Sequence, residues 1–399
     1  MLVTGSDILF FWVVRMVFSG IEFMGELPFK DVYLHGLVRD AQGQKMSKSA
    51  GNGVDPLDVV EAYGADALRF SLATGTTPGN DMRFSTEKVE ASRNFLNKIW
   101  NASRFIMMNL DGETSKHGEM PSLQAADKWI VSKANSLAKE VNENLEKYEL
   151  GLAADKVYSF MWDEFCDWYI EMAKSRLYNA EDDTRQAALW TLKHVLAQGL
   201  KMLHPFIPFI TEEIYTSFGF GETILAADFP KYEDELDFAA EEGQIEQIKE
   251  AVRALRNMRS QMNVPPSRKA KTYVVSADAD VRAVYEAGQA YVCQLAGASE
   301  VTVLAEKVGI EDNAVAVAVA GAEIFMPLAD LIDFAKERER LEKEAKKLQG
   351  EVDRVQAKLN NQGFVSKAPA HLLEEEKAKE AKYNEMLTAV KTQLAQLPQ

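Results

Sequence analysis

The sequence is poor in cysteine. Among its 399 residues there are two, Cys166 and Cys293, which stand far apart in apolar surroundings. A disulfide framework and a cysteine-based zinc site therefore have no support, and we predict no protein-bound metal. Both cysteines are expected to be buried structural thiols of a protein kept in a reducing compartment.

The sequence also lacks an apolar run of membrane length. The run near its start, residues 8–14, is too short to cross a bilayer. It has neither the basic segment before it nor the small-residue cleavage site after it that a secretory signal needs. We therefore expect residues 8–24 to form a buried helix that begins after the turn at Gly5, Ser6 and Asp7. A cytoplasmic protein with no membrane partner is the resulting prediction.

Positive charge is in deficit, with 45 Lys and Arg against 61 Asp and Glu and a formal net charge of −16. This balance argues against a general nucleic-acid binder, because phosphate contacts require local positive charge. It still allows a basic surface on an acidic body. The apolar fraction of 47% is that of a globular protein, and the length predicts two to four domains.

The pattern along the chain predicts a multidomain α/β + α fold in four parts. Residues 1–80 open in mid-strand, so we expect the C-terminal part, or remnant, of a Rossmann-type domain with its boundary inside a longer domain. Residues 81–265 place apolar side chains at helical spacing and predict a helical bundle. Residues 266–330 predict a small α+β module, in which one helix spans residues 280–296.

The last part, residues 331–399, is a charged segment that predicts an antiparallel coiled coil. Its lysines and arginines slightly outnumber its acidic residues, which suits an arm laid along RNA phosphates; a solvated mixed-charge coiled coil is the alternative. The apolar seams include Phe334, Leu341, Leu348 and Val355, answered by Tyr383, Leu387, Val390, Leu394 and Leu397.

The strongest chemical signal is a loop in which Lys45 and Lys48 flank Ser47, with Gly43 and Gly51 on either side. Glycine lets the backbone approach a ligand closely, and ammonium groups neutralise phosphate oxygens. The loop lies between a predicted strand and a predicted helix, where open α/β sheets place their ligands. It would suit a triphosphate whose charge shifts as pyrophosphate leaves. Taken alone, such a string is more often an ordinary solvated surface loop.

This string resembles the KMSKS signature of the class I aminoacyl-tRNA synthetases, and its neighbours agree. Residues 34–40 precede it, and residues 51–56 and 64–69 follow it, in the order usual for the family. The resemblance is most specific over residues 1–105 and covers nearly the whole chain. It implies amino-acid activation as the reaction and ATP, with Mg²⁺, as the cofactor.

The resemblance also implies roles for single residues. Lys48 would stabilise the leaving pyrophosphate with help from Lys45, so both are predicted catalytic residues. His35 and Gly36 would lie near the adenine, and Gly5 and Asp7 near the ribose; for His35 a satisfied structural histidine is the alternative. The predicted ATP-binding residues are therefore Lys45, Ser47, Lys48, His35, Gly36, Gly5 and Asp7.

Within the family, residues 5–12 resemble the valine-specific members, since no Gln-His pair follows Asp7. The C-terminal hairpin and the absence of a cysteine-rich zinc module agree with that branch. The implied partners are valine, ATP and tRNA(Val), and a monomer is expected. Trp12 would form a wall of the amino-acid pocket, with a plain core aromatic as the alternative.

The resemblance makes residues 81–265 an anticodon-binding domain. Unpaired bases are recognised by stacking and by their edges, which suits aromatic rings beside arginines. For any single arginine, an ordinary surface charge pair is the alternative. The predicted tRNA contacts are Arg83, Arg93, Arg104, Arg256 and Arg259, with Phe95 or Trp100 as stacking platforms.

Two parts of the family pattern do not occur in the sequence: the His-x-Gly-His type motif, and the inserted domain that edits mischarged tRNA. We therefore expect this chain alone not to form the aminoacyl-adenylate at a useful rate. One alternative is a tRNA-binding fragment in which Lys45 and Lys48 are idle. Another is a structural helical protein with a coiled-coil partner.

Overall fold

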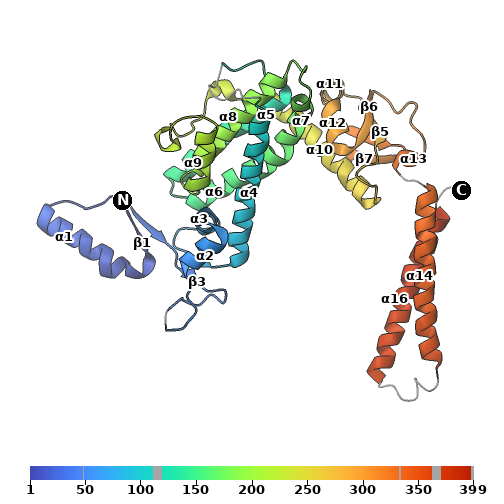
Figure 1. Cartoon of the computed structure of the whole chain (residues 1–399), viewed down its shortest axis with the longest axis horizontal. Helices are drawn as coiled ribbons and strands as arrows, with labels where there is room; N and C mark the ends of the chain where they lie inside the picture. Colours follow the sequence, from blue (N-terminus) through green and yellow to red (C-terminus); the bar gives the residue numbers. More distant parts are fainter. Residues whose placement is uncertain (48, 111–118, 332–333, 362–369, 397–399) are drawn as a thin grey trace. The chain divides into compact units, whose positions relative to one another are not determined.

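The computed structural model describes residues 1–47, 49–110, 119–331, 334–361 and 370–396. The chain is multidomain and mostly helical with small sheets, and it divides into two compact units, Met1–Glu246 and Gln247–Gln399 (Figure 1). No described helix is long and apolar enough to cross a membrane.

The first unit begins with two pairs of short parallel strands. Strand β1 pairs with β2 so that Gly5 lies opposite His35, and β3 pairs with β4. Helix α2 (Pro56–Tyr63) has Pro56 in its first turn, and the Asp55 side chain caps it by accepting the Leu57 amide. The elements are β1 (Leu2–Gly5), η1 (Ser6–Ile8), η2 (Leu9–Val13), α1 (Val14–Met24), β2 (Val32–His35), β3 (Val38–Arg39), α2 (Pro56–Tyr63), α3 (Ala65–Ala73) and β4 (Met82–Arg83).

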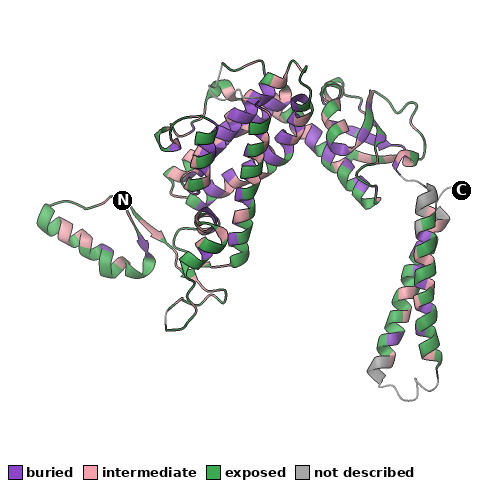
Figure 2. Cartoon of the chain, in the orientation of Figure 1, coloured by how far each residue is buried: buried purple, intermediate pink, exposed green. Residues whose placement is uncertain are grey.

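The prediction that residues 8–24 form a buried helix is wrong in its burial. The segment is helical, with a 3-10 turn and a π-turn before α1, but most of its large apolar side chains face solvent (Figure 2). Phe10 is 78% exposed and Phe23 81%, whereas Val13 is buried. No described element covers this face, so the apolar character that predicted burial instead marks an open surface.

The rest of the first unit is a bundle of helices around a large apolar core. Trp129, Phe165 and Leu192 are fully buried there, which reflects the three- and four-residue spacing of their helices. The elements are α4 (Thr86–Met108), α5 (Ala125–Glu146), α6 (Leu150–Ser159), η3 (Phe160–Tyr169), α7 (Ile170–Tyr178), α8 (Arg185–Leu203), α9 (Pro208–Ser217), η4 (Ile224–Ala226) and η5 (Asp234–Leu236). Helix α10 (Ala239–Gln261) begins in the first unit and ends in the second.

One buried polar network ties the bundle together. The Asp127 carboxylate accepts two hydrogen bonds from the Arg176 guanidinium, at 2.7 and 2.9 Å, and one from the Tyr169 hydroxyl at 2.7 Å. Arg176 also donates to the side chain and carbonyl of Thr184. Burial raises the pKa of Tyr169 well above its usual value, so its hydroxyl stays a donor. A buried charge pair whose bonding groups are satisfied in this way fixes α5 against α7.

The second unit contains a four-stranded sheet with strand order β6-β5-β8-β7. The single helix predicted for residues 280–296 is two helices, because Gly288 separates them and packs against Ile248. The elements are β5 (Ala270–Val275), α11 (Ala279–Ala287), α12 (Gln289–Ala296), β6 (Ala298–Leu304), β7 (Val315–Val319), β8 (Ala322–Met326) and α13 (Leu328–Leu331).

Two long helices, α14 (Phe334–Asn360) and α16 (Ala370–Gln396), end the second unit and lie side by side (Figure 1). They share a hydrophobic cluster of Leu341, Leu348, Val352, Leu387 and Val390. Two predicted seam positions, the Phe334 side chain and Leu397, lie outside the part that the structure describes.

Candidate functional site

The carboxyl ends of β1 and β2 bring three of the predicted ATP-binding residues together. Gly5 and His35 are neighbours in the parallel pair, and Asp7 follows on η1. A Cβ atom at Gly5 would lie 2.9 Å from Asp7 Oδ1 and 3.8 Å from His35 Cε1. A larger residue at Gly5 would therefore push the Asp7 carboxylate out of its present position.

Lys45 joins this corner from the predicted loop. Its Nζ lies 3.4 Å from Asp7 Oδ2, and both side chains are well exposed, Lys45 at 67%. An exposed pair at this distance contributes little to stability, so the ammonium group is free to exchange Asp7 for an incoming anion. Lys48 lies outside the described residues.

The loop that carries Lys45 and Ser47 is held by amide and carboxylate groups. Asn52 accepts the Ser47 amide at 3.0 Å and donates to Asp40 at 2.8 Å, while Asp40 accepts the Gln44 amide at 2.6 Å. These bonds, chiefly that from Asn52, lower the pKa of Asp40 below its usual value. The Ser47 hydroxyl accepts the Ala50 amide at 3.2 Å. Hydrogen bonds between residues of the loop therefore fix its shape.

Gly36 lies where two backbone segments touch. A Cβ atom there would lie 1.6 Å from the carbonyl oxygen of Asn80, so no side chain fits. Next to it, Asp81 accepts the Leu37 amide at 2.7 Å and forms an ion pair with Arg39. These contacts, chiefly the hydrogen bond from the Leu37 amide, lower the pKa of Asp81 below its usual value.

His35 and Trp12 are two further predicted site residues. His35 Nδ1 lies 2.9 Å from the Gly36 carbonyl, and Trp12 on η2 is half exposed.

Helix α3 forms hydrogen bonds with the segment between α8 and α9. These contacts were not predicted from the sequence. The buried Asp66 carboxylate accepts the amides of Phe209 and Ile210, at 3.3 and 2.8 Å, and so caps α9. One turn later, Arg69 donates to the carbonyls of Pro205 and Phe206, both at 3.1 Å. The signal available in the sequence was a charged pair three residues apart in an otherwise apolar helix.

A mostly apolar hollow of about 410 Å³ lies at this junction and reaches the carboxyl end of β2. His35 and Gly36 form one side, and Pro205 and Phe206 of the α8–α9 break form another. The predicted loop region and the bundle are thus parts of one packed unit.

Two of the predicted tRNA contacts are wrong. Phe95 is 0% exposed and packs against Phe70 and Tyr158, so it offers no face to a base. Arg259 is buried, and its guanidinium donates to backbone carbonyls, including that of Arg268 at 2.5 Å. It holds helix α10 against the small module instead of contacting RNA.

The other predicted contacts are at least partly exposed. Arg256 donates to the Leu295 carbonyl at 2.7 Å. Arg93 lies over the Tyr63 ring, 5.2 Å from its centre, and pairs with Glu90. Arg83, Trp100 and Arg104 face solvent.

Cys166 is buried, as predicted, and burial raises the pKa of its thiol to about 12. Cys293 is only half buried, so the prediction that it is buried is wrong.

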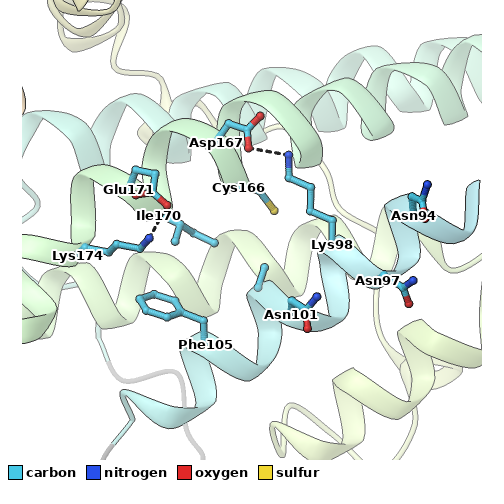
Figure 3. Close-up of a pocket in the computed structure, with 11 residues that line it drawn as sticks. Asn94, Asn97, Lys98, Asn101, Phe105, Cys166, Asp167, Ile170, Glu171 and Lys174 are labelled. Carbon is cyan, nitrogen blue, oxygen red and sulfur yellow. Dashed lines mark hydrogen bonds and ion pairs between the residues drawn. The ribbon is translucent and has the colours of Figure 1, made fainter. Parts of the chain in front are cut away.

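A second hollow, of about 490 Å³, lies in the bundle between α4 and the η3–α7 helix (Figure 3). Lys98 crosses from α4 to Asp167, and Lys174 pairs with Glu171. Sequence reasoning searched for arginines and rings and missed a row of asparagines on α4. The lining residues are Asn94, Asn97, Lys98, Asn101, Ala102, Phe105, Cys166, Asp167, Ile170, Glu171 and Lys174.

Three family models match the chain. The model for tRNA synthetases class I (I, L, M and V) matches residues 1–85. The anticodon-binding domain of tRNA ligase matches residues 127–274, and the valyl tRNA synthetase tRNA binding arm matches residues 333–398.

Individual relatives match over nearly the whole chain. A valine–tRNA ligase of Clostridium acetobutylicum is 55% identical over 399 residues, which is 99% of this chain and 45% of that protein. One of Clostridium perfringens is 55% identical over 391 residues, 98% of this chain and 44% of that protein. The chain thus spans less than half the length of these relatives.

Among solved structures, the ternary complex of Agrobacterium radiobacter K84 agnB2 LeuRS with tRNA and LeuAMS matches with a TM-score of 0.50. The identity is 19%, over 69% of this chain and 30% of that chain. This likeness concerns the fold alone.

Proposed function

Because the chain belongs to the valine–tRNA ligase family of class I tRNA synthetases, we propose that it is the C-terminal portion of an enzyme that activates valine with ATP and transfers it to tRNA(Val). The observation that carries this proposal is the meeting of Gly5, Asp7, His35 and Lys45 at the carboxyl ends of two parallel strands. Open α/β sheets bind nucleotides at this edge.

In the proposed reaction, Lys45 leaves Asp7 and neutralises the phosphate oxygens of ATP as pyrophosphate departs. Lys48 shares this role on the strength of the family motif, and Ser47 donates a hydrogen bond to a phosphate. Gly36 and His35 border the adenine, Gly5 and Asp7 the ribose, and Trp12 the valine side chain. Positioned ammonium groups lower the barrier by stabilising charge that develops on the leaving group.

Magnesium would come to this site with the nucleotide. Among the described residues, no group of three or more His, Cys, Asp or Glu side chains could hold a metal ion. Mg²⁺ is commonly bound by one or two carboxylates together with substrate phosphates, and Asp7 is the carboxylate nearest to Lys45. Asp7 is thus the described residue that would hold the ion, and a bound divalent cation would supply charge neutralisation at the phosphates.

We assign the remaining parts by the same proposal. Residues 1–80 would be the end of a Rossmann-type catalytic domain, residues 81–265 the anticodon-binding domain, and residues 331–399 a coiled-coil arm on tRNA, with residues 266–330 as the module between them. A cytoplasmic monomer completes the proposal.

Labelling with periodate-oxidised ATP, which attaches to lysines beside bound nucleotide, tests the proposed nucleotide site in this chain. We call this site, formed by Gly5, Asp7, His35 and Lys45, the nucleotide corner. We expect Lys45 to be labelled and ATP to protect it, whereas the exposed Lys30 should be labelled weakly with no protection. Equal labelling of both lysines, unaffected by ATP, would overturn the nucleotide site.

The second candidate function is a tRNA-binding fragment without catalysis, favoured by the open apolar face beside the nucleotide corner. ATP binding separates the candidates. An electrophoretic shift should show binding of tRNA(Val) in either case, and a shift without ATP binding would favour the fragment. Pyrophosphate exchange dependent on valine should be near background for this chain alone, and clear turnover would contradict the fragment interpretation.

A further inference from the structure

We propose that Glu376 and Glu380 fix the register in which helices α14 and α16 pair, and so position the arm that the proposed function lays on tRNA. Both carboxylates stand in the seam between the two helices, which we define as the rows of buried and half-buried side chains along α14 and α16. The apolar pattern of the sequence predicted the seam but not these two positions. The link to tRNA rests on the proposed function, whereas the register itself does not.

The seam row on α16 follows a regular pattern. Its side chains recur alternately three and four residues apart, which is the spacing with which two packed helices bury one face. Two neighbouring positions of this row are glutamates, and the others are apolar or aromatic. The row on α16 consists of Leu373, Glu376, Glu380, Tyr383, Leu387, Val390 and Leu394. The corresponding row on α14 is uncharged and consists of Leu341, Ala345, Leu348, Val352, Val355 and Leu359.

Glu376 is a buried charge with a cation on each helix. Its side chain is 6% exposed, and Oε1 accepts a hydrogen bond from Lys379 Nζ of α16 at 2.9 Å. That bond chiefly lowers the pKa of Glu376 below its usual value, so the carboxylate is charged at neutral pH. Lys358 Nζ of α14 lies 3.6 Å from Oε2, and no described group donates a hydrogen bond to this oxygen. In the observed register, α14 therefore compensates the buried charge through Lys358.

Contacts farther along the helices specify the same alignment. Gln356 Nε2 donates to Glu380 Oε1 at 2.9 Å, and Lys391 Nζ donates to Gln349 Oε1 at 3.4 Å. Together with the contact of Glu376, these bonds follow the two helices in opposite directions, as a single antiparallel alignment requires.

An apolar seam alone would not fix this alignment. Apolar rows of this kind repeat every seven residues, so they match again when one helix shifts by one repeat. A shift of seven residues would move α16 by about 10 Å along α14. In either direction it would take Glu376 and Glu380 away from Lys358 and Gln356, and a buried charge without its partner is strongly unfavourable. The two carboxylates thus select the observed register over its neighbours.

The register matters for RNA binding because lysines and arginines occur on both helices of the arm. A slipped pair would keep its helices and its net charge, but the cations of α16 would be displaced by about 10 Å relative to those of α14. Phosphates have fixed positions along an RNA backbone, so cations of both helices could no longer meet them together. Glu376 and Glu380 are therefore positioning residues of the arm.

Distances between spin labels on the two helices test the register in the whole chain, without RNA. The labels are attached to Lys346→Cys on α14 and Ala389→Cys on α16, because both positions are exposed. Cys293→Ser removes the half-buried thiol, and the buried Cys166 stays unlabelled. Double electron–electron resonance should give a single distance for the chain that keeps its seam glutamates.

The double variant Glu376→Leu/Glu380→Leu makes the seam fully apolar and should add a second distance. Its helix content by circular dichroism should not fall, since leucine favours helices and suits a seam. A merely structural pair of glutamates would instead lose helix content on replacement and keep one distance. Glu375→Leu/Glu385→Leu, at exposed positions of the same helix, is the matched control and should keep one distance.

A glutamine pair separates polarity from shape and charge. Glu376→Gln/Glu380→Gln keeps the size of the side chains and their buried polar ends, which still need partners, and should keep the single distance. Its net charge equals that of the leucine pair. The leucine pair should therefore bind tRNA(Val) about tenfold more weakly than the glutamine pair at the same salt concentration, through the loss of register alone.

Each outcome decides one part of the inference. A single distance in the leucine pair, or a second distance in the glutamine pair as well, would overturn the role of these polar groups in the register. A slipped leucine pair that binds tRNA(Val) as tightly as the glutamine pair would overturn their role in positioning the arm. If the unchanged chain binds no tRNA(Val), the proposed function of the arm fails, while the distances measured without RNA still decide the register.

Discussion

The bundle and the first 55 residues bury their apolar side chains to very different degrees. In the bundle, Phe95 and Trp129 are 0% exposed, and the buried Asp127 carboxylate accepts hydrogen bonds from Tyr169 and Arg176. In residues 8–24, phenylalanines of similar size face solvent. The bundle completes its own core, whereas the beginning of the chain presents apolar surface of the kind that other protein covers.

The two regions are also held in place by different kinds of contact. Packing and buried bonds hold the bundle, while exposed carboxylates and amides hold the loop around Lys45. A loop of the second kind can change shape at low cost, which suits the role proposed above for Lys45. A rigid bundle suits recognition of a partner in one register.

A pair of phenylalanine truncations tests the contrast most strongly. Phe95→Ala should destabilise the bundle by about 4 kcal/mol, because it removes a fully buried ring and leaves a cavity. Phe23→Ala, at a side chain that is 81% exposed, should change stability by less than about 0.5 kcal/mol. Urea unfolding followed by circular dichroism measures both. Similar losses in the two variants would abolish the contrast.

The buried ion pair gives a second test within one helix. Asp127→Ala should cost about 3 kcal/mol, since it leaves the Arg176 guanidinium buried without its carboxylate. Glu140, also on α5, pairs with Lys156 at 2.7 Å, but both side chains are largely exposed. Glu140→Ala should therefore cost no more than about 1 kcal/mol. The same unfolding experiment compares the two, and an equal cost would show that burial does not decide.

Much of the bundle could be predicted from the sequence, because helical spacing records which face is buried. Ile99 and Phe95 fall on the same apolar row, so the row itself argued against Phe95 as an RNA platform. The exposure of residues 8–24 could not be predicted. An apolar composition indicates that a segment will be buried, but it does not identify what buries it. The bond partners of Arg259 and Asp66 lie far along the chain or across a turn, and periodicity carries no information about them.

The hydrogen bonds from α3 to the segment between α8 and α9 connect the beginning of the chain to the bundle. Removing them should have an intermediate effect on stability. Asp66→Ala should cost about 1–2 kcal/mol, because the Phe209 and Ile210 amides lose their cap. Hydrogen exchange of those two amides should accelerate. Asp58→Ala, an exposed acid on α2, is the control and should leave them unchanged. Protection that survives in Asp66→Ala would show that packing alone fixes the break.

The smallest effect concerns acid titration of the loop. Asp40 and Asp81 have pKa values below the usual 3.8, chiefly through the Asn52 side chain for Asp40 and the Leu37 amide for Asp81. Because the folded pKa is the lower one, each carboxylate supports the loop above pH 3.8, and that support is lost as the pH falls further through the folded value. The amide shifts of Gln44 and Leu37, followed by NMR, should therefore move below pH 3.8 and not at it. Asp81→Asn should remove the titration at Leu37 and leave that at Gln44, since the two carboxylates hold different amides. If both amides lost their titration together, the loop would be a single cooperative unit and would resemble the bundle more than the contrast allows.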